Sequence, residues 1–427
     1  MSVDVCLGVD VGTGSVRCAA FDMTGKQHGE AFTSPIRISS PAPQFYQQST
    51  KDIMTNIERV IKLTIANECI NVTGIGFAAT CSLVFLDENF EGVSVHPDHE
   101  DVDEDIIVWM DHRAENETLE LNKLKAKAHQ FVGGRFSPEM ELPKLKWVKK
   151  NLPETWKKTS HVFDLADYLS FKATSVKARS VCTLVCKWGW LAEINDWEDD
   201  LLRDFGLEDL KSKTEGVVKL PGEAIGNISE EFSVATGLSQ TVFVSASLID
   251  AHSGALGILK ASVKSDAATR LALIAGTSNC HMMLIPDCRF VRGVWGPYES
   301  AIIPGEFLLE GGQTSAGSTI DWLLNLTKSS FDDLQSKAQD LSQLTDVLCI
   351  PDFHGNRSPL ANPLIKGSFH NIAIHTTAEE LFLSLIQGLA LGTKLIIERI
   401  ESESCITIDE LVLTGGLARS KVKLSIG

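Results

Sequence analysis

Several features that often reveal a function are missing from this sequence. No Cys-x-x-Cys pair occurs among the ten cysteines, and Cys182 and Cys186 are the only two as close as four residues apart. A zinc ribbon or a dithiol redox motif is therefore disfavoured. No glycine-rich loop ending in Gly-Lys-Ser or Gly-Lys-Thr is present, so a P-loop mechanism is not supported. No apolar run reaches the roughly 18–20 residues that span a bilayer, and no basic, then apolar leader opens the chain.

A positive field is also lacking. The 427 residues carry a net charge of −17, which argues against a nucleic-acid backbone as the main ligand. A small phosphate ligand stays possible because backbone donors hold one locally. The hydrophobic content of 44% and charged content of 22% are those of a soluble globular protein, and the length favours two domains. With scattered thiols and no leader, we expect a cytoplasmic protein without nucleic-acid or membrane partners, and leave a homodimer open.

Two distant segments repeat one pattern, a β-prone strand, a glycine turn with hydroxyl residues, and a second strand. The first runs through Gly12-Thr13-Gly14-Ser15, and the second through Gly276-Thr277-Ser278. Glycine lets backbone amides approach an anion closely, and Thr and Ser hydroxyls add uncharged donors. If the two hairpins face each other, they would clamp a polyphosphate from both sides. This doubling is the main clue to function.

Around these hairpins the sequence alternates helical and strand patterns, which predicts an α/β fold with two domains, 1–260 and 261–427. We expect strands or hairpins over 5–22, 72–86, 241–247 and 410–413, helices over 51–70, 115–132, 142–151, 165–174, 315–326 and 377–400, and a connector or short strands over 209–221.

Two aspartates occupy positions suited to metal binding or to proton transfer. Asp10 precedes the first glycine turn, where a carboxylate can hold Mg²⁺ beside bound phosphates; alternatively it only caps the turn. Asp250 ends an apolar strand, a position suited to a general base for a hydroxyl; alternatively it is the N-cap of the helix that follows.

Other candidates are glycine pairs and isolated polar residues. Gly311-Gly312-Gln313 follows a predicted strand at 307–310, and Gly415-Gly416 follows another; both would let backbone approach a base or ribose, or are plain strand-to-helix turns. Lys187 and Glu310 are single charges in apolar surroundings, suited to polyol hydroxyls or to a neighbouring charge. Cys81 reads as a buried thiol that nothing marks as a nucleophile.

Together these segments resemble the FGGY family of carbohydrate kinases, whose fold is related to actin, hexokinase and the ribonuclease-H-like group. The resemblance runs from Asp10-Val11-Gly12-Thr13 through Trp109-Met110-Asp111-His112-Arg113 to Gly415-Gly416. The segments Thr80-Cys81-Ser82-Leu83 and Cys186-Lys187-Trp188 look most like the ribulokinase branch, especially eukaryotic D-ribulokinase.

The resemblance implies a two-domain actin-like fold with a cleft between the domains, and ATP with Mg²⁺ as the phosphate source. It implies that Asp250 is the base and that Asp10 binds Mg²⁺. It further implies that phosphates are held by Gly12, Thr13, Ser15, Gly276, Thr277 and Ser278, that Gly311, Gly312, Gln313, Gly415 and Gly416 border the nucleoside, and that Thr80, Cys81, Asp111, Lys187 and Glu310 line the sugar pocket.

Family members usually continue beyond the glycine pair, so we expect the second domain to be incomplete here. The sequence predicts an ATP-dependent pentulose kinase, with D-ribulose as the favoured substrate. The alternatives are a kinase for L-ribulose, xylulose or ribitol, a silent form that binds a ligand or a protein, and an actin- or chaperone-like ATPase.

Overall fold

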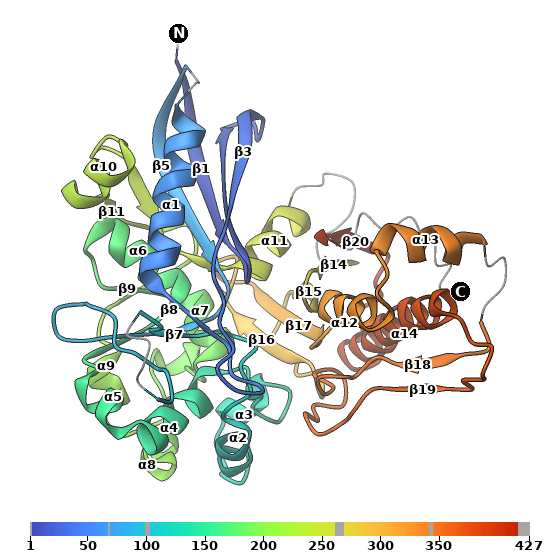
Figure 1. Cartoon of the computed structure of the whole chain (residues 1–427). Coiled ribbons are helices and arrows are strands. Elements are labelled where there is room, and N and C mark those ends of the chain that lie inside the picture. The colour runs from blue at the N-terminus through green and yellow to red at the C-terminus, as the bar shows by residue number, and fades with distance from the viewer. Residues whose placement is uncertain (1, 67–68, 99–102, 261–268, 341–344, 417–427) are drawn as a thin grey trace. The chain divides into compact units, whose positions relative to one another are not determined.

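The computed structural model describes residues 2–66, 69–98, 103–260, 269–340 and 345–416 (Figure 1). The chain forms two compact units. Unit 1 comprises Met1–His129, Pro138–Ser253 and Glu299–Gly305, and unit 2 comprises Gln130–Ser137, Gly254–Tyr298 and Glu306–Gly427. Unit 1 thus includes the late segment Glu299–Gly305, and unit 2 includes the early segment Gln130–Ser137. A single division of the sequence at residue 260 does not describe these two exchanges.

Unit 1 is built on a mixed sheet. Strand β1 (Val3–Val11) pairs antiparallel with β2 (Ser15–Asp22) and parallel with β5 (Ile70–Ala79). Buried and exposed residues alternate along β1, as expected for a sheet with one covered face. The sheet is completed by β3 (Gln27–Pro35), β11 (Ala224–Asn227), β12 (Phe243–Ser245) and β13 (Leu248–Ile249), in the order β11-β12-β5-β1-β2-β3, with β13 also paired to β5.

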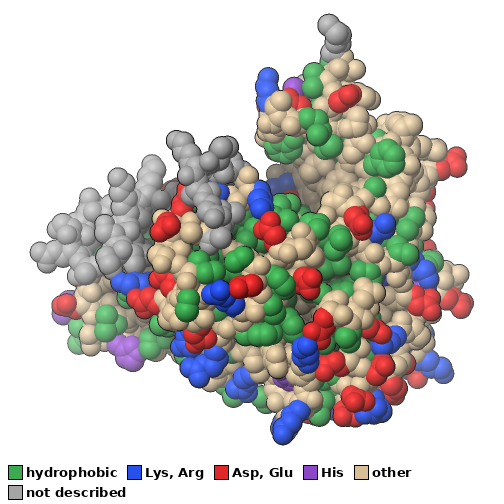
Figure 2. All heavy atoms as spheres, turned by 180° about the vertical axis from the view of Figure 1, so that it is seen from behind, with side chains coloured by type: hydrophobic (Ala, Val, Ile, Leu, Met, Phe, Trp, Pro, Cys, Tyr) green, Lys and Arg blue, Asp and Glu red, His purple; other side chains and the backbone are tan. Residues whose placement is uncertain are grey.

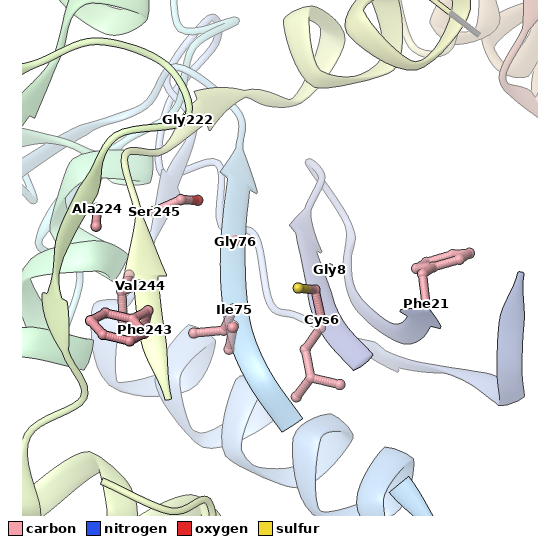
Figure 3. A pocket seen from close by; sticks show the side chains of 12 residues that line it. Cys6, Gly8, Phe21, Ile75, Gly76, Gly222, Ala224, Phe243, Val244 and Ser245 are labelled. Atoms are coloured by element: carbon pink, nitrogen blue, oxygen red, sulfur yellow. The ribbon is translucent and has the colours of Figure 1, made fainter. Parts of the chain in front are cut away.

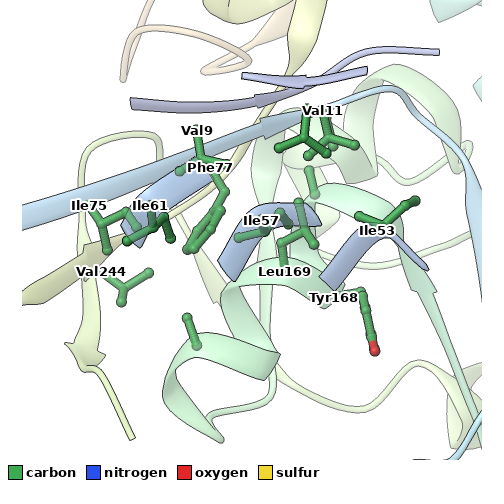
Figure 4. Packing of buried hydrophobic residues seen from close by; sticks show 14 of the residues in the cluster. Val9, Val11, Ile53, Ile57, Ile61, Ile75, Phe77, Tyr168, Leu169 and Val244 are labelled. Atoms are coloured by element: carbon green, nitrogen blue, oxygen red, sulfur yellow. The ribbon is translucent and has the colours of Figure 1, made fainter. Parts of the chain in front are cut away.

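The covered face carries the core of unit 1. Helix α1 (Thr50–Ile65) begins at Ser49, whose hydroxyl accepts from the amide of Asp52, and it buries a stripe that includes Ile53, Ile57 and Ile61. These side chains pack in one cluster with Val9 and Val11 of the sheet (Figure 4). Burial of each such aliphatic chain is worth about 1.5–3 kcal/mol, so this helix anchors the strands that carry the first glycine turn.

The remainder of unit 1 contains a second, antiparallel sheet, a strand pair and short helices. The sheet has the order β4-β7-β6-β8, and β9 pairs with β10. The bounds are β4 (Gln47–Gln48), β6 (Leu83–Leu86), β7 (Ile106–Ile107), β8 (His161–Asp164), β9 (Ala178–Ser180), β10 (Val217–Lys219), α2 (Glu115–Leu121), α4 (Glu141–Asn151), α5 (Pro153–Lys158), α6 (Leu165–Thr174), α7 (Val181–Lys187), a 3-10 turn (Ala192–Ile194), α8 (Asp199–Phe205), α9 (Leu210–Lys213) and α10 (Glu230–Thr236).

Unit 2 holds another mixed sheet, of order β16-β17-β15-β14-β20. The bounds of its elements are β14 (Arg270–Ala275), β15 (Asn279–Ile285), β16 (Trp295–Glu299), β17 (Phe307–Gln313), α12 (Gly317–Thr327), α13 (Phe331–Asp340), β18 (Leu348–Ile350), β19 (Ser368–His370), α14 (Ala378–Ser404) and β20 (Glu410–Thr414). Helix α3 (Ala128–Phe131) begins in unit 1 and ends in unit 2. Helix α11 (Asp250–Leu259) begins in unit 1 and ends in unit 2.

The two sheets share one arrangement, which confirms the doubling inferred from the sequence. In unit 1, β1 is antiparallel to β2 and parallel to β5. In unit 2, β14 is antiparallel to β15 and parallel to β20. A glycine turn joins the antiparallel pair in both units.

The predicted helix over 115–132 is wrong as one element. Helix α2 ends at Leu121, and a new start follows because the carboxylate of Glu198 accepts from the amides of Lys127 and Ala128, both at 2.9 Å. Glu198, which lies far along the chain, thus caps the start of α3, and no pattern in the neighbouring residues predicts a helix start there. The predicted connector over 209–221 contains α9 and β10.

Two strand predictions also need correction. The predicted strand over 241–247 is shorter in the structure, where β12 covers only Phe243–Ser245, and the separate strand β13 begins after it at Leu248. The segment Gly311-Gly312-Gln313 does not follow a strand but forms the last part of β17. There Gly311 pairs with His281 of β15, and Gln313 pairs with Asn279.

Helix α14 is long and apolar enough to cross a membrane by length and composition alone, and 44% of its most apolar window is buried inside the protein. The core helix of a soluble protein passes the same test, so this is weak support for a membrane span. Figure 2 shows acidic and basic side chains interspersed over one face of the molecule rather than a basic stripe.

Candidate active site

Three parallel strands of unit 1 end side by side. The register pairs Val11 of β1 with Ala79 of β5, and Ala79 with Ile249 of β13. The next residues along the chain are Gly12, Thr80 and Asp250, so these three predicted site residues leave the same edge of the sheet together. The carboxyl ends of parallel strands are where open α/β sheets bind ligands.

The first glycine turn is tight and anchored. The amide of Gly12 donates to the carbonyl of Ser15 at 3.0 Å. The hydroxyl of Thr13 accepts from the indole nitrogen of Trp109 at 3.0 Å, and its carbonyl accepts from Gln48 at 2.8 Å. These contacts hold the turn in one shape, as a preorganised anion site requires.

Asp10 forms an ion pair with Arg17 across the β1–β2 ladder, with Oδ2 3.0 Å from Nη1. Burial raises the pKa of Asp10, and the Arg17 guanidinium counteracts the rise. A partly exposed carboxylate of this kind is an oxygen ligand suited to Mg²⁺. A cation there would compete with Arg17.

Asp250 is both the end of the strand and the start of the helix. Its Oδ1 accepts from the amide of Ala251 at 2.8 Å, and its side chain is partly exposed. An N-cap side chain accepts from the amide two or three residues further on, and Asp250 is itself the first residue of α11, so this bond to Ala251 is not the N-cap predicted as an alternative. It orients the carboxylate and does not by itself exclude a role as a base.

Beside Thr80 lies a buried polar cluster, formed by Cys81, Glu141, Lys144, Asp164 and Lys187. All five are less than one tenth exposed. Burial raises the pKa of the Cys81 thiol well above its usual value, opposed by the charges of Lys187 and Lys144. Cys81 is thus a protonated thiol at neutral pH, in agreement with the sequence-based interpretation.

Asp111 lies fully inside the protein. Its carboxylate accepts from the backbone and the guanidinium of Arg113, with Oδ2 2.8 Å from Nη2, and from the amide of Tyr46 at 2.6 Å. This bidentate pair fixes the loop that also carries Trp109. The structure gives Asp111 a positioning role, and its contact with sugar stays a prediction.

The second glycine turn is closed by the start of α12. The amides of Ala316 and Ser318 donate to the carbonyl of Thr277 at 2.9 and 3.2 Å, and Gly317 donates to Gly276 at 3.1 Å. A Cβ on Gly317 would lie 2.6 Å from the Gly276 carbonyl oxygen, so only glycine permits this approach. Thr277 and Ser278 stay partly exposed.

Gly415 lies in unit 2, at the end of the sheet where β14 leads into the second glycine turn. It follows β20, has a φ of +97°, and a Cβ there would lie 2.3 Å from the carbonyl oxygen of Ala275. Glycine is required here both by conformation and by space. Gly415 thus adjoins the strand that leads into the second turn, whereas Gly416 is exposed, with nothing within 4 Å of an added Cβ.

The glycines within β17 have a packing explanation. A Cβ on Gly311 would lie 2.6 Å from Ile396, and one on Gly312 would lie 2.7 Å from Arg357. Gln313 accepts from Asn279 at 2.7 Å and donates to Leu389 at 2.9 Å. These three residues therefore shape the interior of unit 2, and their contact with a nucleoside stays a prediction.

Glu310 is almost completely buried in unit 2, with Oε1 3.9 Å from Nη1 of Arg357. The Arg357 guanidinium lies 4.8 Å from the centre of the Trp295 ring. The alternative of a neighbouring charge is thus present for Glu310. Its role toward a polyol stays a prediction.

Sequence reasoning missed Glu141 altogether. Among the residues that the structure describes, neither carboxylate oxygen of Glu141 has a hydrogen-bond partner, and burial raises the pKa of Glu141 to about 7, opposed by Lys144 and Lys187. The only local sign was a Glu and a Lys three residues apart at the start of a helix. Trp109, which holds Thr13, was named only as part of a motif.

One hollow on unit 1 lies away from these residues. It has a volume of about 440 Å³, sits over the open face of the sheet, and is lined by small and apolar residues such as Gly8, Gly76 and Phe243 (Figure 3). None of the predicted site residues lines it.

Comparison with known proteins agrees with this geometry. Residues 5–257 match the N-terminal domain, and residues 271–426 the C-terminal domain, of the FGGY family of carbohydrate kinases. An FGGY carbohydrate kinase domain-containing protein of Homo sapiens is 40% identical over 97% of this chain and 82% of its own length. A D-ribulokinase of Saccharomyces cerevisiae is 33% identical over 98% of this chain and 67% of its own length.

Solved structures share the fold. A xylulose kinase from Rhodospirillum rubrum superposes with a TM-score of 0.78 at 18% identity, over 97% of this chain and 82% of that one. A glycerol kinase from Plasmodium falciparum, solved with ADP, gives 0.77 at 17% identity, over 98% and 83%. Two domain matches that together cover most of the sequence, with relatives of this identity, establish the family. The chain belongs to the FGGY family of carbohydrate kinases.

Proposed function

We propose that this protein transfers the terminal phosphoryl group of ATP to a hydroxyl group of a pentulose, with D-ribulose as the preferred acceptor. The observation that carries the proposal is the register that sends Gly12, Thr80 and Asp250 from neighbouring strand ends. In this proposal, one end of the unit 1 sheet would supply the phosphate-binding turn at Gly12, a polar side chain at Thr80 and the carboxylate of Asp250.

In this proposal Asp250 accepts the proton of the attacking hydroxyl. A new bond forms between that oxygen and the terminal phosphorus, while the bond from phosphorus to the oxygen of the departing ADP breaks. The amide of Ala251 holds the Asp250 carboxylate in place. Positioning and charge neutralisation supply most of the rate in phosphoryl transfer.

Phosphate oxygens would be held by backbone amides and by hydroxyl groups of the two glycine turns, Thr13 and Ser15 in unit 1, and Thr277 and Ser278 in unit 2. Bound Mg²⁺ would supply neutralisation of the phosphate charge. Asp10 is the carboxylate we assign to it. That the turns face each other stays a prediction.

The sugar is assigned from the polar cluster and from the relatives. Lys187 is suited to donate to hydroxyl or carbonyl oxygens. Thr80, whose hydroxyl lies 3.1 Å from that of Ser82, occupies the strand position next to Asp250. The match to a D-ribulokinase over 98% of this chain supports a pentulose. Ten cysteines without a disulfide support a reducing compartment, so we propose a cytoplasmic enzyme.

The decisive experiment measures ADP release by the whole chain with D-ribulose, L-ribulose, D-xylulose, ribitol and glycerol in turn. The proposal expects the highest kcat/KM for D-ribulose. ADP release that does not depend on any sugar would indicate an ATPase, and sugar binding without ADP release a silent binding protein. Either result contradicts the proposal.

Asp250→Asn tests the base directly. Loss of a general base lowers kcat by roughly 10²–10⁴-fold, while sugar affinity should change little because size and the Ala251 contact are retained. Ser253→Ala, one turn further on the same helix, is the control and should retain turnover. Unchanged kcat in Asp250→Asn would remove Asp250 from this role.

A further inference from the structure

The cluster of Cys182, Cys186 and His252 is not used by the proposed chemistry. Within the described part of the chain these are the residues whose ligand atoms gather as a metal site requires, all within 4.8 Å of one another. Each is 0% exposed. We infer that this cluster is a zinc-binding site in unit 1.

The ligand spacing suits a tetrahedral ion. With zinc–ligand bonds of about 2.0–2.3 Å, neighbouring ligand atoms stand about 3.5–3.8 Å apart. Sγ of Cys186 lies 3.2 Å from Nε2 of His252, so this pair needs to separate by only a few tenths of an ångström, and all three ligand atoms already lie within 4.8 Å of one another. Cys182 and Cys186 lie four apart on α7, on one face of the helix, and Cys-x3-Cys falls within the spacing used by zinc sites.

The charges of the three ligands also determine which ionic charge is favoured at this site. Binding of Zn²⁺ releases two thiol protons to solvent and forms a complex of two thiolates, one neutral imidazole and one dication. That complex is neutral, whereas a monovalent cation would leave a net negative charge. Because an unbalanced charge is costly in a buried setting, the divalent ion is favoured. Three protein ligands leave the fourth position for water.

Neighbouring contacts hold the ligand-bearing elements together before any ion binds. Asp167 Oδ1 accepts from the amide of Ser180 at 3.0 Å and from the Ser247 hydroxyl at 2.8 Å. Its Oδ2 accepts from the Thr183 hydroxyl at 2.7 Å. The start of α7 is thereby tied to the segment that leads into α11, so the ligands are preorganised.

The site would link two elements of the proposed catalytic apparatus. Cys186 immediately precedes Lys187, and His252 follows Asp250 by two residues. Zinc would fix the end of α7 against the first turn of α11. The inference does not depend on the kinase proposal, because its readouts are metal content and stability.

The test uses the full chain, produced with zinc in the medium and passed through gel filtration under reducing conditions. We expect an equimolar amount of zinc in the purified protein, and an intense sulfur-to-metal absorption band after replacement by Co²⁺. Cys182→Ala or Cys186→Ala should reduce bound zinc at least 10-fold and abolish the band. The control Cys18→Ala, at another buried cysteine, should retain both.

A second measurement covers the case in which an alanine variant fails to fold. A coloured zinc chelator is added to the wild-type protein during denaturant unfolding, and zinc should be released together with the loss of helical circular dichroism. The inference is overturned if the wild-type protein carries only background zinc, if the chelator removes the ion from the folded protein at once, or if a folded Cys182→Ala variant keeps its zinc.

Discussion

At the scale of single residues, the buried carboxyl of Glu141 makes stability depend on pH. Burial raises its pKa from 4.5 to about 7, so the folded state binds a proton more tightly than the unfolded state. The free energy of unfolding contributed by this group is greatest below pH 4.5 and falls as pH rises toward 7.

Glu141→Gln removes this penalty while keeping size and shape. We expect the variant to be more stable than wild type at pH 8 by roughly 1–3 kcal/mol, and to show less decline between pH 5 and pH 8 in urea unfolding. Glu154→Gln, at an exposed position of α5, is the control and should follow the wild-type curve. A Glu141→Gln curve parallel to wild type would contradict the assignment.

At the scale of elements, the start of α12 must approach the second glycine turn closely. Gly317→Ala places a methyl group 2.6 Å from the Gly276 carbonyl oxygen, so the helix or the turn must shift. We expect a loss of about 1–3 kcal/mol in stability, typical of overpacking, and weaker ADP binding in calorimetry.

The matched control is Gly257→Ala, because Gly257 lies in α11 with nothing within 4 Å of its added Cβ. It should be neutral or stabilising by roughly 0.5–1 kcal/mol, the usual gain for alanine over glycine in a helix. Equal effects of the two substitutions would mean that the approach of α12 does not shape the turn.

At the scale of the whole molecule, acceptor binding should stabilise the folded chain. A ligand present at 100 times its Kd adds about 2.7 kcal/mol to the free energy of unfolding. D-ribulose should therefore raise the unfolding temperature, and Asp250→Asn should show a similar rise although it lacks turnover. Absence of a shift with every pentulose, measured by calorimetry, would contradict pentulose binding.

Local patterns were sufficient for much of the fold. The 3–4 spacing of Ile53, Ile57 and Ile61 predicted α1, and glycine beside Thr13 and Thr277 predicted both hairpins, because periodicity and turn chemistry act between near neighbours. The family resemblance then related Asp250 and Lys187 to a kinase. The predicted helix over 115–132 failed because Glu198, far along the chain, caps a new helix at Ala128.

The sequence by itself therefore determined the repeated strand–turn–strand plan and the family. Only the tertiary structure decided which residues meet. The strand register brings Asp250 beside Thr80, and the fold brings His252 against Cys186, 66 residues away. Packing leaves Glu141 buried without a hydrogen bond to any residue in the described ranges. The physical reason is that long-range contacts depend on sheet pairing and side-chain packing, neither of which has a local period in the sequence.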